Sequence, residues 1–426
     1  MPLVLGLVSL YTTCSLRADI NIPSDGSDGA LIITTNTVID LGRAVTGHWN
    51  DNNNAHAGDG IYDPEKWAVV FKYTNVTVAA GATLTFKNHP KRPPVVWLVQ
   101  GDVTIDGTVS LDGGQPTTRF DNAEPGPGGS RGGSGYIPSG VAEAAGFGIG
   151  GGAVLPGIRF GAFGSDIRAY GNPSVLPLIG GSGAGGAPYR PVSTSDFPDG
   201  FGNAGGGAGG GAILIASKRT FAISGAVKAN GGLGGYYFLS EYQPAFAACG
   251  SGGAIRIIAT DCVGSGTLSA VTSAGRDSIA WGGPGRIRIE RSRADVGLHS
   301  NPDPSVLELT DGDTPQIWLP DSGPTVKIVS VNNQQAPADP RAEFAAIGAD
   351  LVLPQVSTSE VVVETTNVER ESTVKVRVTP RSNGNFTLTQ ATLDQVVTED
   401  PLVIRWKANV PVNNGYSALQ VHVVRP

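Results

Sequence analysis

Residues 211–232 read GAILIASKRTFAISGAVKANGG, two short aliphatic segments joined through small residues and closed by a glycine pair. Closely similar sequences occur at residues 95–114 and 253–270, and a fourth copy begins at residue 285. Side chains alternate between the two faces of a strand, so each copy carries one apolar row. A single copy cannot bury that row, whereas stacked copies cover one another's aliphatic side chains. The repeat therefore predicts an all-β fold built around a parallel β-solenoid (β-helix).

Glycine is concentrated where these copies occur. Of the 61 glycines, 43 fall between residues 126 and 285, mostly in runs beside β-branched segments. Glycine costs more backbone entropy to order than any other residue, so its repeated use beside strands indicates tight corners or close backbone contact. Short strands joined by glycine turns would also fit an antiparallel sandwich or barrel, and this alternative stays open.

Composition divides the chain into three parts. We expect a signal-like segment at residues 1–18, and a glycine-rich β-solenoid domain at residues 19–315 with a long glycine-rich loop at about 115–204. Residues 320–426 contain little glycine and several alternating segments, including TVKVRVT at residues 373–379. That rhythm is typical of half-buried antiparallel strands and predicts an immunoglobulin-like or fibronectin-like β-sandwich.

Charge and hydropathy bear on the possible partners. The net charge is −7, which argues against nucleic acid, because phosphate binding needs a basic face. No uniformly apolar stretch reaches the 18 residues that a membrane-spanning helix needs, so we expect no membrane span. The signal-like start predicts a secreted or cell-surface protein. The sequence leaves the oligomeric state open.

Only three cysteines are present, and one of them, Cys14, lies within the signal-like segment. The other two, Cys249 and Cys262, are 13 positions apart and flank a glycine turn and a strand. In an oxidising compartment such a pair can form a disulfide, so we expect either that bond or two buried thiols.

Candidate catalytic residues are few. Asp102 and Asp106 share the outward side of a strand whose inward residues are Val103 and Ile105, and Arg119 follows as a cation. Paired carboxylates can cleave a glycosidic bond when they are held at the right separation. The plainer interpretation is that these acids are solvated on a solenoid surface.

The most polar stretch offers a possible metal site. Asp51, Asp59 and Asp63 carry hard oxygen ligands of the kind that calcium prefers, although the spacing is not that of an EF-hand. An Asn/Asp-rich turn explains the same residues without a metal. Calcium is the only cofactor that the sequence suggests.

Aromatic residues in the glycine-rich part are candidates for carbohydrate binding. Tyr236, Tyr237, Tyr242 and Trp281 could stack on sugar rings if a rigid scaffold presented them. The alternative is that these rings pack against the core or under the long loop.

The copies at residues 211–232 and 253–270 resemble the glycine-rich coils of large secreted bacterial surface proteins with β-solenoid-like repeats. That resemblance covers roughly residues 76–289 and implies no catalytic residues. It favours a non-enzymatic structural or adhesion-type protein that binds a polysaccharide or a cell-surface or matrix component. The alternative functions are a polysaccharide lyase or glycoside hydrolase on a β-helix scaffold, and a self-assembling filament subunit.

Overall fold

The computed structural model describes residues 18–117, 122–135, 144–153, 171–186, 205–238, 244–273, 282–293, 297–340, 349–381 and 384–426. This described part is all-β. Its only helical elements are two single 3-10 turns, η1 (Leu41–Arg43) and η2 (Asn54–His56). None of its helices is long and apolar enough to cross a membrane.

The largest sheet contains ten strands, and it collects the first aliphatic segment of every repeat copy. Its path runs β18-β16-β14-β10-β7-β5-β4-β3, while β1 pairs with β5 and β8 pairs with both β10 and β5. The sheet is mixed, because β4 runs antiparallel to β5 whereas the other pairs are parallel. The strands are β1 (Gly29–Ile33), β3 (Val45–Thr46), β4 (Ile61–Asp63), β5 (Ala68–Val78), β7 (Val95–Val99), β8 (Val103–Ile105), β10 (Ala212–Ile223), β14 (Ala254–Val263), β16 (Arg286–Arg291) and β18 (Ser305–Glu308).

A second sheet collects the second segment of each copy. Its six strands run parallel in the order β17-β15-β11-β9-β6-β2. They are β2 (Thr37–Asp40), β6 (Thr83–Lys87), β9 (Thr108–Ser110), β11 (Ala226–Lys228), β15 (Thr267–Ser269) and β17 (His299–Asn301). Matching residues of successive copies are paired, since Val227 lies between Val109 and Leu268.

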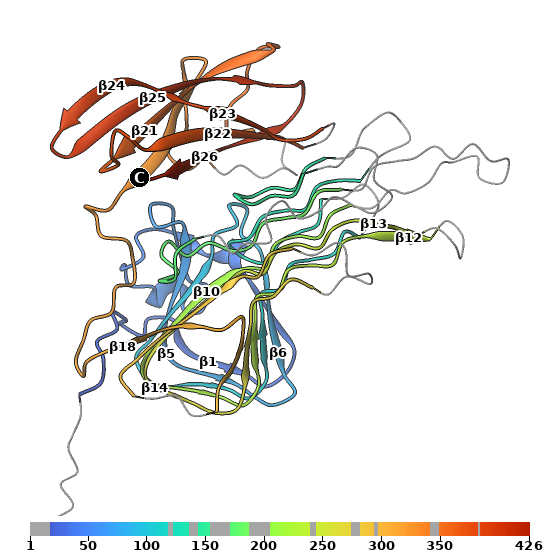
Figure 1. Cartoon of the computed structure of the whole chain (residues 1–426). Coiled ribbons are helices and arrows are strands. Elements are labelled where there is room, and N and C mark those ends of the chain that lie inside the picture. Colours follow the sequence, from blue (N-terminus) through green and yellow to red (C-terminus); the bar gives the residue numbers. More distant parts are fainter. Residues whose placement is uncertain are drawn as a thin grey trace, which may run out of the picture.

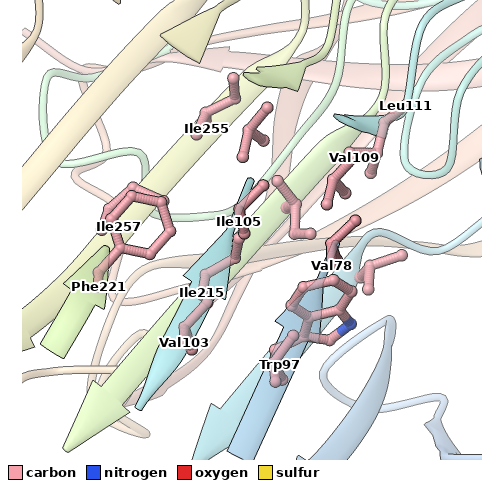
Figure 2. Close-up of a cluster of buried hydrophobic side chains, with 14 of the residues drawn as sticks. Val78, Trp97, Val103, Ile105, Val109, Leu111, Ile215, Phe221, Ile255 and Ile257 are labelled. Atoms are coloured by element: carbon pink, nitrogen blue, oxygen red, sulfur yellow. The ribbon is translucent and has the colours of Figure 1, made fainter. Parts of the chain in front are cut away.

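The two sheets enclose one aliphatic core. Ile213, Ile223, Ile255 and Ile287 all belong to it and are at most 2% exposed. Ile255 pairs with Ile213 on one side and Ile287 on the other, so equivalent side chains of adjacent copies lie in register. Figure 2 shows the same alignment for further members of the core. Burying each side chain of this size contributes about 1.5–3 kcal/mol, which explains why the repeat conserves aliphatic residues at these positions within the chain.

Beyond these sheets, glycine-rich segments pack side by side without forming strands. We call them the glycine bundle; its segments are residues 111–114, 126–133, 144–152, 180–186, 205–211, 229–235 and 247–253. In Figure 1 they extend from the region of β10 toward β12 (Tyr236–Phe238) and β13 (Pro244–Phe246). Three of them lie within residues 115–204, where the sequence predicted one long loop.

The central segment of the bundle, residues 205–211, is buried along its whole length. Its backbone N–H groups donate hydrogen bonds to three neighbouring segments in succession. Each of these segments accepts a second bond from the residue three positions further along. The bonds are Gly206 to Gly133 and Gly209 to Ser130, Gly207 to Ala248 and Gly210 to Ser251, and Ala208 to Gly114 and Gly211 to Leu111.

A period of three distinguishes this packing from a β-sheet. Side chains and hydrogen bonds alternate with a period of two along a strand, whereas a polyproline II helix has three residues per turn and no internal hydrogen bonds. Neighbouring segments supply the missing bonds here. The central carbonyl groups are also used, since Gly207 accepts from Ala184 and Gly210 from Gly181. Backbone hydrogen bonds therefore hold this region together, and among the described residues the only apolar cluster confined to it is Ala184 with Ala248.

The C-terminal part forms two antiparallel sheets over a separate core, which is the arrangement of a β-sandwich. One sheet has the order β20-β19-β21-β25-β24 and the other β23-β22-β26. Val363 and Trp406 from the first sheet pack with Val374 and Val376 from the second. The strands are β19 (Thr325–Val331), β20 (Gln334–Gln335), β21 (Thr358–Thr366), β22 (Thr373–Pro380), β23 (Thr387–Gln390), β24 (Thr392–Glu399), β25 (Leu402–Pro411) and β26 (Ser417–Val424).

Candidate functional site

The acidic residues of the first copy bond to the second copy. Asp102 accepts a hydrogen bond from the backbone N–H of Thr220 at 3.1 Å, and Asp106 accepts one from the hydroxyl of Ser224 at 2.5 Å. Asp112 accepts from the N–H of Asn230 at 2.6 Å. All three bonds span 118 positions, the offset at which the two copies pair. The carboxylates are therefore cross-links between the first and second copies of the repeat.

The same row continues into the third copy. The side-chain oxygen of Asn230 accepts hydrogen bonds from the N–H of Val271 at 3.0 Å and from the hydroxyl of Ser269 at 2.7 Å. Asp102 and Asp106 thus each bond the first copy to the second. Arg119, the cation suggested for the enzymatic alternative, lies outside the described residues.

The structure does not bring the predicted calcium ligands together. Asp63 accepts three backbone hydrogen bonds, from Trp49, Glu65 and Lys66, at 2.8–3.0 Å. Asp51 accepts from the N–H of His48 at 2.9 Å, and Asp59 forms an ion pair with Arg43 at 3.0 Å. Within the described ranges, no group of three or more His, Cys, Asp or Glu side chains is placed to hold a metal ion. Asp51 and Asp63 thus accept backbone hydrogen bonds and Asp59 pairs with Arg43, so the three acids are engaged separately, and calcium binding stays a prediction.

A buried lysine near this polar stretch escaped the sequence analysis. Lys72, on β5, has a side chain only 1% exposed, and its Nζ donates to Asp25 at 3.1 Å and to the carbonyl of Asp51. Burial raises the pKa of Asp25, but hydrogen bonds from Ser27 and Lys72 outweigh it and the pKa is lowered. A buried charge needs such a partner. The pair fastens the N-terminal segment to the ten-stranded sheet.

Asp28, next to Lys72, also joins the N-terminal segment to β5 and to residues 53–58 through hydrogen bonds. It accepts from the N–H of Lys72 at 2.7 Å, from the side-chain amide of Asn53 at 2.7 Å and from the N–H of Gly58 at 3.0 Å. The clue in the sequence was a lysine within the apolar run AVVFKY at residues 68–73. The cluster is satisfied internally and its role is structural.

One group of ion pairs in the sandwich contains a glutamate whose pKa is lowered. Glu364, on β21, lies between Lys327 at 2.8 Å and Arg405 at 3.3 Å. The hydrogen bond from Lys327, together with the charge of Arg405, holds the pKa of Glu364 below its usual value despite partial burial. The carboxylate is 14% exposed, so the group links β19, β21 and β25 while remaining in contact with solvent.

Of the two alternatives for the cysteine pair, the structure shows the two buried thiols. Cys249 and Cys262 are both buried thiols, and burial raises the pKa of Cys249. Cys262 belongs to the aliphatic core near the end of β14, whereas Cys249 lies in the glycine bundle before that strand begins. A ten-residue strand is roughly 30 Å long, far more than the ~7 Å that a disulfide allows between Cα atoms. The extended strand therefore separates the two thiols.

Two of the four aromatic candidates lie on a described element. Tyr236 and Tyr237 belong to β12 (Tyr236–Phe238), which pairs antiparallel with β13 (Pro244–Phe246). Tyr242 and Trp281 lie outside the described residues.

Backbone bonds on both sides of this hairpin join it to the glycine bundle. The N–H of Gly235 donates to Gly205, and the N–H of Ala247 donates back to Gly235. Figure 1 shows the hairpin at the end of the bundle that points away from the two parallel-paired sheets. Tyr236 and Tyr237 therefore lie on a short hairpin that continues two segments of the bundle.

Comparison with known proteins does not identify this arrangement: no protein-family model, no curated protein and no solved structure matches the chain.

Proposed function

We propose that the chain is a non-enzymatic extracellular protein of the structural or adhesion type. In this proposal a parallel β-solenoid over residues 19–315 serves as the scaffold, and the β12–β13 hairpin contacts a polysaccharide or matrix component. Residues 320–426 act as an immunoglobulin-like or fibronectin-like spacer, and residues 1–18 direct export to the exterior. The observation that carries the proposal is the position of Tyr236 and Tyr237 on a hairpin anchored to the glycine bundle.

The pairing of the repeat copies supports the solenoid part of the proposal. Residues 95–99, 213–217 and 255–259 lie on adjacent parallel strands, and the second strands of the same copies pair in the other sheet. Each copy thus contributes strands to both sheets and covers the apolar row of the next.

The nature of the bundle supports the binding part of the proposal. A ligand binds more tightly when the recognition element is already ordered before contact, because less conformational entropy is lost on binding. The segments beside the hairpin are held by backbone hydrogen bonds and have few side chains that can change rotamer. Aromatic rings mounted on such a base can present an apolar face to sugar rings at low entropic cost.

A glycan and matrix-protein array tests this proposal. We expect binding by the wild-type protein, and roughly a five- to thirtyfold loss for the Tyr236→Ala/Tyr237→Ala double variant, since removing stacked rings costs about 1–2 kcal/mol. Leu233→Ala is the matched control, because Leu233 is an exposed apolar residue of the same glycine-rich segment. Equal losses for both variants, or no binding to any glycan or matrix protein, would reject the hairpin as the recognition element.

The polysaccharide lyase or glycoside hydrolase alternative has less support. Its candidate acids, Asp102 and Asp106, already bond to the neighbouring copy. An activity screen on uronic-acid polymers addresses it directly. Turnover that disappears in Asp102→Asn or Asp106→Asn, with the unfolding midpoint unchanged, would reinstate the enzymatic interpretation.

A further inference from the structure

The C-terminal sandwich contacts one edge of the glycine bundle. The N–H of Ala145 donates to the carbonyl of Gly384 at 3.2 Å, and Ala144 forms a parallel β-bridge with the same glycine. From the sandwich, Arg377 donates through Nη2 to the carbonyl groups of Gly146 and Gly151, both at 3.0 Å. In Figure 1 the sheet that contains β22 is the layer of the sandwich that faces the bundle.

Arg377 is placed unusually for a residue on the outside of a sandwich. Val374, Val376 and Val378 of β22 face the sandwich core, so Arg377 and Thr379 face away from it, yet they are only 5% and 0% exposed. The Nε of Arg377 donates to the hydroxyl of Thr379 at 3.0 Å. The bundle therefore buries the outer face of β22 at this point.

The guanidinium remains a cation in this setting. Burial lowers the pKa of Arg377 to about 10, which still leaves it charged at neutral pH. The guanidinium carbon of Arg377, Cζ, lies 3.7 Å from the centre of the Phe386 ring, within the range of a cation–π contact. Two carbonyl oxygens, a hydroxyl and an aromatic face replace the water that burial removes.

Residues 144–152 form an edge of the bundle on this side. Inward, Gly152 donates to Gly183, and Gly183 donates back to Phe147. Outward, the carbonyl groups of Gly146 and Gly151 meet Arg377. The fit is close, since a Cβ on Gly151 would lie 2.7 Å from Nη2 of Arg377 and 2.1 Å from the oxygen of Gly146.

An exposed edge of this kind is a template for association. Without the sandwich, the N–H of Ala145 and the carbonyl group of Gly146 lose the partners that the sandwich supplies, and they can pair, as the groups of an edge strand do, with the same kind of segment from another chain. We propose that the C-terminal sandwich caps this edge of the glycine bundle, that Arg377 is the positioning residue of the cap, and that an uncapped edge pairs with a bundle segment of a second copy of this chain.

Two variants test the cap from opposite sides. Arg377→Met removes the donors at similar volume from the sandwich, and Gly151→Ala displaces both the guanidinium and the carbonyl group of Gly146 that accepts from it. Arg370→Gln is the control, because Arg370 is an exposed arginine of the same sandwich that pairs with Glu399. The readouts are amide hydrogen exchange over residues 144–152 and sedimentation velocity over a range of protein concentrations.

We expect at least tenfold faster exchange at residues 144–152 in both variants, with β14 and β21 still protected. The sedimentation coefficient of both should rise with concentration more than that of the wild-type protein and the control. Arg377→Lys, which retains a cationic donor, should fall between wild type and Arg377→Met.

Unchanged exchange at residues 144–152 in both variants would overturn the assignment of Arg377. Faster exchange without concentration-dependent sedimentation would overturn the protection against self-association. If Arg377→Met unfolds the sandwich, so that β21 loses protection, Arg377→Lys decides the question, because it retains a cationic donor and the length of the side chain. None of these readouts involves glycan binding, so the outcome is independent of the proposed recognition by the hairpin.

Discussion

Replacing Gly209 by alanine tests whether backbone contact holds the glycine bundle together. Gly209 lies in the buried central segment, and its φ is outside the left-handed region, so an L-residue can adopt its conformation. Space is the obstacle, because a Cβ would lie 1.9 Å from the carbonyl oxygen of Gly181 and 2.2 Å from its carbon. Both atoms belong to the backbone, which cannot move away by a rotamer change as a side chain can.

The expected cost follows from these contacts. Forcing an extra methyl group into a packed interior costs about 1–3 kcal/mol. Separating the segments also weakens the bonds from Gly209 to Ser130 and from Gly181 to Gly210, each worth about 1 kcal/mol net. Alanine recovers about 0.4–1 kcal/mol by restricting the unfolded chain. We therefore expect a net destabilisation of about 2–3 kcal/mol.

Hydrogen exchange in the native state measures this locally. A loss of about 2–3 kcal/mol corresponds to roughly 30- to 150-fold faster exchange of the bundle amides, while amides of the sandwich stay unchanged. Gly235→Ala is the matched control in the same bundle, because its Cβ would lie 3.1 Å from a side-chain carbon of Pro116 and 3.2 Å from the oxygen of Gly205. That change should cost less than about 1 kcal/mol. If the two substitutions had the same effect, close backbone packing would not be what requires glycine here.

Three further outcomes are expected. Asp112→Ala should lower the free energy of unfolding by about 1 kcal/mol in urea denaturation, because it removes the bond to Asn230; no change would mean that the cross-link contributes nothing. The folded-state pKa of Glu364 is depressed, so its contribution to stability is present above the unfolded pKa of about 4.3 and is lost as pH falls through the lower folded value. Glu364→Gln should abolish that part of the acid destabilisation of the sandwich. An unaltered dependence of stability on pH would refute this role of Glu364. Cys249 and Cys262 should react with a thiol reagent only after denaturant is added, and a reducing agent should leave the unfolding midpoint unchanged; a shift in that midpoint would indicate a disulfide.

The alternation of residues was enough to predict strands. The aliphatic positions of the repeat, such as Ile213 and Ile255, are buried in the core, and residues 373–379 lie on a strand of the sandwich. These features could be predicted because the two-residue period of a strand is local. The reversed direction of β4 within an otherwise parallel sheet could not, because strand direction depends on how the chain returns.

The candidate sites were harder to predict, because their partners are distant in the sequence. Asp102 and Asp106 looked like a surface pair, but their bonding partners lie 118 residues away. Lys72 and Arg377 carried no motif, and only the folded chain shows that each is buried and held by oxygen atoms.

By itself, the sequence determined the all-β character, the positions of the aliphatic core and the region in which glycine would be required. Only the tertiary structure decided what the glycines do. A glycine has no side chain whose pattern can be read, and the hydrogen bonds of residues 205–211 reach back to residue 111 and forward to residue 251. The three-residue rhythm of those bonds appears only once the segments lie side by side, because each segment turns its N–H groups toward a different neighbour.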